Sequence, residues 1–277
     1  MRRALLVLLL GLAAGGCVGG RTVVPVSMES SPAPIPRSAR EFVTHEQAVR
    51  GVAAIMVRDL RLPVPPRLTM YVYSSRSIFE EGLVNDGRVS RLRAAELSDF
   101  AAGIGKRRQL LLHHAGAISS PEWLRLLAHE LTHVSQIEMA QGEGRADQWL
   151  AEGMAEWTAF HVLERLHLDT LARRRAAAVQ GVRRHPALSA GRLDLETLGS
   201  PQGFTTRHLR DGSQQTYQLV FLLADQLIER HGYDRLLEYF SSFARRADRR
   251  ANFEAAFGQS LAEFEQEALT HLSPATQ

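Results

Sequence analysis

Apolar positions recur at helical spacing over most of the chain, and alternate with polar ones in only a few short stretches. Residues Leu68 to Tyr73 alternate and predict a strand, and residues 98–104 and 108–114 are also strand-like. A short helix or turn is expected at 77–82. The helical pattern predicts helices at about 39–61, 121–140, 147–168, 170–183, 213–231, 234–246 and 260–271.

Residues 184–212 contain Gly, Pro and Ser without a clear period, which predicts a partly irregular connector. Strands are therefore expected in the first part of the chain and mostly helices after it. This order predicts an α+β fold. We find no internal repeat and no second long hydrophobic segment.

The predicted helix at 121–140 carries the clearest chemistry. Ser120-Pro121-Glu122 is typical of a helix start, with an N-cap, a first-turn proline and an acidic residue. His129 and His133 are four positions apart, so both project from nearly the same face and can bind one metal ion. Glu130 is placed to reach a water at that metal. The apolar positions around this face are Leu126, Leu127, Leu131, Val134 and Ile137.

A second acidic motif follows the first. Eighteen residues, 134 to 151, separate His133 from Glu152, and the glycines in this interval allow a second helix to return to the first. Glu152 can complete a His, His, Glu set with a fourth position open for water, which is the pattern of a catalytic zinc site. Glu156 lies one turn further on the same face. It can accept a hydrogen bond from the far ring nitrogen of a ligand histidine.

His129-Glu130-Leu131-Thr132-His133 followed by Trp149-Leu150-Ala151-Glu152-Gly153-Met154-Ala155-Glu156 resembles the gluzincins, the thermolysin-like and M1-aminopeptidase-like zinc metallopeptidases. The closest resemblance is to the bacterial peptidase MA-like domain, and its specific motifs cover about residues 98–160. The resemblance implies a zincin-like fold, in which an N-terminal lobe holds a small mixed sheet and the metal-binding helix, a C-terminal lobe is helical, and the metal lies between the two lobes. It also implies one zinc ion per chain, bound by His129, His133 and Glu152.

The expected reaction is hydrolysis of a peptide bond. Zinc would lower the pKa of a bound water, and Glu130 would take its proton and pass it to the leaving amine. In M1-like enzymes a tyrosine near the start of a later helix stabilises the oxyanion, and Tyr217 is the best match. His208 and His231 are weaker candidates for this role. His231 precedes Gly232 and is expected in a last helical turn.

The resemblance also implies that substrate pairs with an edge strand before the metal helix. Residues Arg107 to His113 are expected to form that strand, with 101–105 as a loop or strand beside it. His113 and His114 are interpreted as strand-end residues rather than ligands. No G-A-M-E-N-like segment is present, which favours an endopeptidase over an aminopeptidase.

Less specific interpretations stay open at this point. The two histidines can be structural, and Tyr217 can be an amphipathic core residue. A zinc-holding envelope module that binds a partner, or supports its folding without turnover, is the alternative function. The retained base, Glu130, favours hydrolysis because a binding module does not need it.

The N-terminus predicts export from the cytoplasm of a bacterium. Arg2-Arg3 precede an apolar run that is too short to span a membrane, and the run is followed by small residues and Cys17. Cys17 is the only cysteine and resembles the lipidated cysteine of a lipobox, which implies a lipid anchor in the cell envelope, at the periplasmic or outer membrane. Ordinary cleavage that leaves a secreted protein stays open.

After this signal peptide at 1–17, residues 18–40 are rich in Gly, Pro and Ser and are predicted to be a tether. The peptidase domain is then expected at 41–277, and a capping box at Ser38 to Glu41 is expected to open its first helix. The net charge is +3, and every basic residue except Lys106 is an arginine. The arginine clusters at 173–175, 183–184, 245–246 and 249–250 are interpreted as solvated helix faces, with attraction to anionic lipid or an acidic substrate as the alternative. With no nucleic-acid motif, the expected partners are a peptide or protein substrate and the membrane. The oligomeric state does not follow from the sequence.

Overall fold

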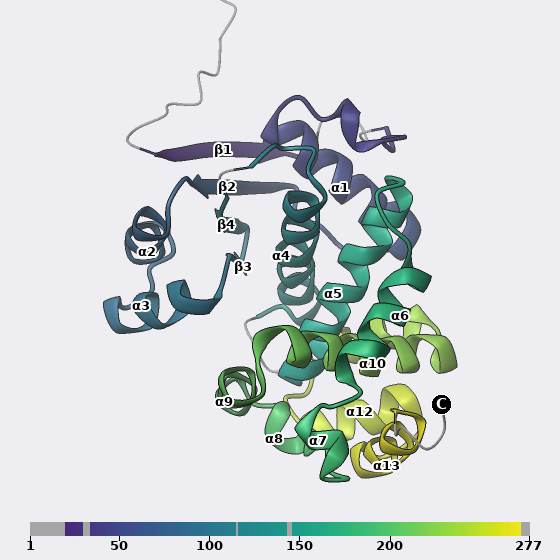
Figure 1. Ribbon diagram of the computed structural model, residues 1–277. Coiled ribbons are helices and arrows are strands. Elements are labelled where there is room, and N and C mark those ends of the chain that lie inside the picture. The colour runs from purple at the N-terminus through teal and green to yellow at the C-terminus, as the bar shows by residue number, and fades with distance from the viewer. Residues whose placement is uncertain (1–19, 30–33, 115, 143–145, 273–277) are drawn as a thin grey trace, which may run out of the picture.

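The computed structural model describes residues 20–29, 34–114, 116–142 and 146–272 and shows an α+β fold in which helices predominate (Figure 1). A small sheet lies in the first part of the chain, and every regular element described after it is a helix. Cys17 and the predicted signal peptide lie outside the described residues. Within the described ranges, none of the helices has the length and apolar character needed to span a membrane.

The sheet is mixed and has four strands in the order β1-β2-β4-β3. They are β1 (Arg21–Ser27), β2 (Arg67–Tyr73), β3 (Gly103–Lys106) and β4 (Gln109–His113). β2 and β4 are parallel, whereas β1 and β3 each pair antiparallel with their neighbour. The strands predicted at 68–73 and 108–114 are confirmed. β4 lies between β2 and β3, however, and the edge strand on its side of the sheet is β3, so the expectation that Arg107 to His113 forms the edge is wrong.

The first strand corrects the prediction of a tether over residues 18–40. β1 pairs with β2 along its whole length, and Val26 is buried in the main core. Pro25 is tolerated because β1 is an edge strand, where a missing N–H can face away from the sheet. The Ser38 capping box is present but opens only a 3-10 turn, η1 (Ala39–Glu41). The predicted helix 39–61 is therefore divided, and a second capping box at Thr44 starts α1 (His45–Leu60).

Two short helices, α2 (Arg76–Asn85) and α3 (Arg91–Phe100), lie against the sheet. Between these helices and the sheet is a separate hydrophobic cluster that includes Phe79 and Leu111. α3 continues to Phe100, so the strand predicted at 98–104 begins only at Gly103.

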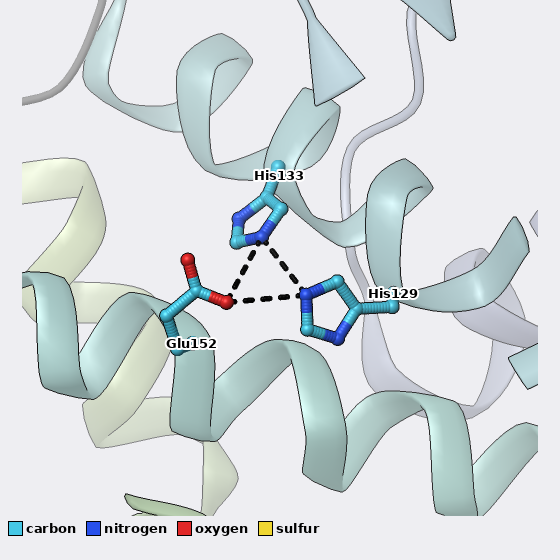
Figure 2. Close-up of side chains that lie close together, drawn as sticks. All are labelled: His129, His133 and Glu152. Atoms are coloured by element: carbon cyan, nitrogen blue, oxygen red, sulfur yellow. Dashed lines mark hydrogen bonds and ion pairs between the residues drawn. The ribbon is translucent and has the colours of Figure 1, made fainter. Parts of the chain in front are cut away.

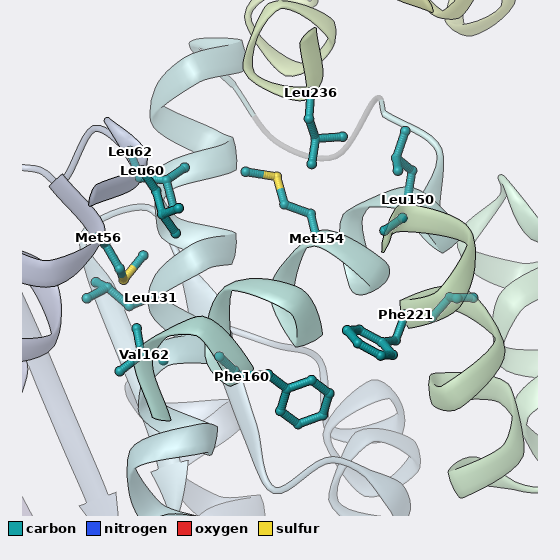
Figure 3. Packing of buried hydrophobic residues seen from close by; sticks show 14 of the residues in the cluster. Met56, Leu60, Leu62, Leu131, Leu150, Met154, Phe160, Val162, Phe221 and Leu236 are labelled. Carbon is teal, nitrogen blue, oxygen red and sulfur yellow. The ribbon is translucent and has the colours of Figure 1, made fainter. Parts of the chain in front are cut away.

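The main core is formed where α1 and the long helices pack together: α4 (Pro121–Ala140), α5 (Gln148–Arg165) and α10 (Ser213–His231). Figure 3 shows Met56, Leu131, Met154 and Phe221 within it. Burial of each such side chain contributes about 1.5–3 kcal/mol. α6 (Leu171–Val182) packs on α10.

The segment 184–212 is more regular than predicted and contains α7 (Pro186–Ser189), α8 (Leu195–Leu198) and α9 (Pro201–Asp211). The predicted helix 234–246 ends earlier, as α11 (Tyr233–Ser242). α12 (Arg249–Phe257) follows and was not predicted, and α13 (Leu261–Leu272) confirms the last helix.

Candidate metal centre

α4 brings the two histidines of the first motif together. Its start is capped as expected, with Ser120 accepting a hydrogen bond from the Trp123 backbone and Pro121 in the first turn. Leu127, Leu131 and Val134 are fully buried and fix the helix against the core. The face with His129 and His133 then meets α5, on which Glu152 lies.

The three predicted ligands converge on one point (Figure 2). His129 Nε2 lies 3.2 Å from both His133 Nε2 and Glu152 Oε2, and His133 Nε2 lies 3.6 Å from Glu152 Oε2. Ligand atoms about 2.1 Å from a tetrahedral zinc lie about 3.4 Å from one another. Two imidazole nitrogens and one carboxylate oxygen at these separations therefore fit a zinc ion.

The electrostatics of this cluster also favour a cation at its centre. Burial opposes protonation of His129, but hydrogen bonding to Glu152 and Glu156 outweighs it and raises the pKa to about 10. Burial likewise opposes the charge on Glu152, yet His133 and His129 hold its pKa well below the usual value. A metal ion can supply the same positive charge in place of the protons.

Glu156 lies behind His129. Its Oε1 is 3.0 Å from His129 Nδ1. Arg125 Nη1 donates to the same carboxylate at 2.5 Å. Burial raises the pKa of Glu156, but His129 and Arg125 lower it overall and keep the group ionised. Glu156 thus has the position expected of a group that orients a ligand histidine.

The other two ligands are held in a similar way by glutamines. Gln136 Oε1 lies 2.9 Å from His133 Nδ1, and its Nε2 donates to the Ala151 carbonyl on α5. Gln148 Nε2 donates to Glu152 Oε1 at 2.8 Å, which leaves Oε2 directed at the two histidines. Each ligand therefore has a partner on the side away from the centre.

Glu130 lies beside the three ligands but is not one of them. Its Oε2 accepts a hydrogen bond from the Gly105 backbone at 2.7 Å, which connects it to the edge strand β3. Burial raises the pKa of its carboxyl above the usual value. A buried carboxylate with a raised pKa is suited to accept and return a proton.

Tyr217 lies near the start of α10, and its ring centre is 6.0 Å from that of His129. Burial, followed by the nearby carboxylate of Glu152, raises the pKa of its hydroxyl well above the usual value, so it stays a hydrogen-bond donor. His208 packs edge-on against Tyr217, with ring centres 5.7 Å apart.

The remaining candidate histidines lie elsewhere. His231 ends α10, as expected. His113 stacks on Phe79, and His114 packs against Trp123.

The sequence predicted this cluster of candidate ligands but not the residues that contact it. Gln136 follows His133 by three residues and Gln148 precedes Glu152 by four, so each glutamine shares a helix face with the side chain that it contacts and could have been recognised. Arg125 contacts Glu156 from another helix, and local spacing does not show this contact. Gly105 comes from a strand distant in sequence, and no local pattern identifies its contact with Glu130.

Comparison with known proteins leaves the chain without an assigned family. A scan against protein-family models found no match, and searches of curated proteins and of solved structures found no similar protein.

Proposed function

We propose that this protein is a zinc-dependent metallopeptidase of the gluzincin type, with a zincin-like arrangement of sheet, metal helix and helical lobe. The observation that carries the proposal is the combination of three converging ligand atoms with a separate buried carboxylate, Glu130, beside them. A structural metal site closes its coordination with protein ligands, whereas a catalytic zinc site has three ligands and an open position.

In this proposal His129, His133 and Glu152 hold the metal. Zinc bound there would supply Lewis-acid chemistry, making a water more acidic and polarising the scissile carbonyl. Glu130 accepts the proton of the attacking water at its carboxylate and delivers it to the leaving amine. The Tyr217 hydroxyl, kept protonated by its surroundings, donates a hydrogen bond to the oxyanion.

The edge strand β3 provides the place for an extended peptide. One side of β3 pairs with β4, and Gly103 to Lys106 line a cavity next to the ligands. A substrate that adds to the other side by main-chain hydrogen bonds would pass directly over Glu130. Since such pairing needs no free terminus, we propose an endopeptidase. The N-terminal sequence further supports a location in the bacterial cell envelope, with Cys17 as a lipid anchor.

The test is cleavage of a quenched-fluorescence peptide library by the purified wild-type chain and by Glu130→Gln. We expect the variant to keep its fold and metal but to lose hydrolysis by about three or more orders of magnitude, because the base acts in the transition state. Bound zinc without cleavage by the wild type would favour the alternative of a zinc-holding envelope module. Equal cleavage by both proteins would contradict the role of Glu130.

A further inference from the structure

Two cavities meet at the ligand cluster and together form the cleft. Both are lined by Phe100, Gly103, His129, Glu130 and Tyr217. One, of about 430 Å³, extends along α4 past His133, and the other, of about 520 Å³, extends in the opposite direction past Arg125. A peptide lying over the ligands would therefore place residues on either side of its scissile bond in different cavities.

The first is the apolar cavity. Apart from the ligands and their partners, its walls are mainly apolar, and include Val89, Leu97, Ile104, Ile137 and Phe204. The cations at its edge are already paired, since Lys106 donates to the Gly87 carbonyl and Arg93 pairs with Glu96. Its exposed apolar surface is thus the main feature that a substrate side chain would meet.

The second is the arginine cavity. Arg125 and Arg174 line it, together with the neutral polar side chains of Ser213, Gln214 and Gln218. Among the described residues that line it, the carboxylates are Glu130 and Glu156, which already accept hydrogen bonds from Gly105 and Arg125. A new anion in this cavity would therefore meet cations and neutral donors.

Both guanidinium groups are held in place and still accessible. Arg125 is fixed by Glu156, and its side chain is 40% exposed. Arg174 pairs with Asp169 at 2.5 Å, lies over the Phe160 ring and is 38% exposed. A guanidinium has five N–H donors, so one carboxylate partner leaves donors free for a second.

We propose that the cleft selects peptides with a large apolar residue on one side of the scissile bond, bound in the apolar cavity, and an acidic residue on the other, bound by Arg174 and Arg125. This inference rests on the peptidase function proposed above and names its substrate class. The acidic group is recognised by charge and hydrogen bonding, and the apolar group by burial.

The test uses the full, zinc-loaded chain and four matched quenched peptides. They carry Phe or Ala on one side of the scissile bond and Glu or Gln on the other. We expect kcat/KM to be highest for the Phe and Glu peptide, with a loss of about tenfold for Phe to Ala and about three- to tenfold for Glu to Gln.

A pair of neighbouring arginines provides a matched control. Arg174→Glu should abolish or reverse the preference for Glu over Gln, whereas Arg173→Glu should preserve it. Arg173 is adjacent, 73% exposed and also pairs with Asp169, but it does not line the cavity. In the same way Leu97→Gln should weaken the preference for Phe, whereas Leu92→Gln, on the 75% exposed Leu92 of the same helix, should not.

The outcomes separate this inference from the function on which it rests. Glu130-dependent cleavage with equal rates for Glu and Gln peptides would overturn the selection and leave the peptidase function intact. Equal effects of Arg174→Glu and Arg173→Glu would also overturn it, because both variants change the net charge equally. Absence of Glu130-dependent cleavage of any peptide in the wider library would overturn the peptidase function, and the selection with it.

Discussion

The hydroxyl of Tyr217 is the side-chain group proposed to meet the oxyanion. Its ring lies between His129, Phe204 and His208. Because Tyr217→Phe keeps the ring, we expect the fold and zinc content to stay unchanged. kcat should fall by about 10²–10³, with a smaller effect on KM, because the lost hydrogen bond acts in the transition state. A wild-type kcat in this variant would show that Tyr217 serves packing alone.

Protons would compete with zinc for the proposed ligands. Burial lowers the pKa of His129 but the surrounding carboxylates raise it, and the result is a pKa of about 10. The pKa of His133 is also raised, because the nearby Glu152 outweighs the effect of burial. Zinc must displace the protons that these histidines hold, so zinc affinity should fall as the pH is lowered, by about tenfold per unit for each proton released. Competition with a chelator of known pH dependence at about pH 6, 7 and 8 measures this. An affinity independent of pH would contradict it.

The cluster of candidate ligands was predictable because the spacing of its residues is local. His129, Glu130 and His133 lie within one and a half helical turns, and Glu152 and Glu156 follow on one helix face. The partners of these residues are less predictable, since Arg125, Gln136 and Gln148 are common surface residue types. The two glutamines contact a residue of their own helix, whereas only the packing of α4 against α5 brings Arg125 to Glu156.

At the scale of elements, β3 and α4 are in close contact at Gly105. A Cβ there would lie 2.2 Å from the Glu130 carbonyl oxygen and 3.0 Å from His133 Cβ. Gly105→Ala should therefore push β3 away from α4, lengthen the hydrogen bond to Glu130 and lower kcat/KM by about tenfold or more. The zinc content of this variant should fall less than its kcat/KM. As a control, Gly142→Ala introduces a Cβ that has no atom of the described residues within 4 Å and should retain activity. Equal activity of the two variants would contradict this prediction.

The strength of the local sequence pattern determined which helices and strands could be predicted. Long amphipathic helices such as α4 and α10 have clear periodic patterns, and α5 follows from its length and its apolar content. β1 was missed because its segment also contains the glycines and prolines of a linker, and its pairing with β2 is distant in sequence. Strand order was also not predictable. The short apolar run of β4 indicates a strand but does not show that β3 covers its edge.

At the scale of the whole molecule, Trp149 connects the metal centre to the C-terminal helices. It lies three residues before Glu152, is fully buried, and packs on Phe253 and Phe264 of α12 and α13. Trp149→Ala should reduce the free energy of unfolding by about 3–5 kcal/mol, measured by denaturant unfolding. Leu209→Ala, at a 70% exposed position, should change it by less than about 0.5 kcal/mol. A similar small effect at Trp149 would contradict its proposed role in the core.

Zinc binding by His129, His133 and Glu152 is the central claim, because the roles of Glu130, Tyr217 and the cleft depend on it. Native mass spectrometry of the full chain, after reconstitution with zinc and removal of excess metal, tests it most directly. We expect one zinc per wild-type chain and none retained by His133→Ala, which removes one of three protein ligands. Absence of zinc in the wild type, or full retention by the variant, would contradict the account.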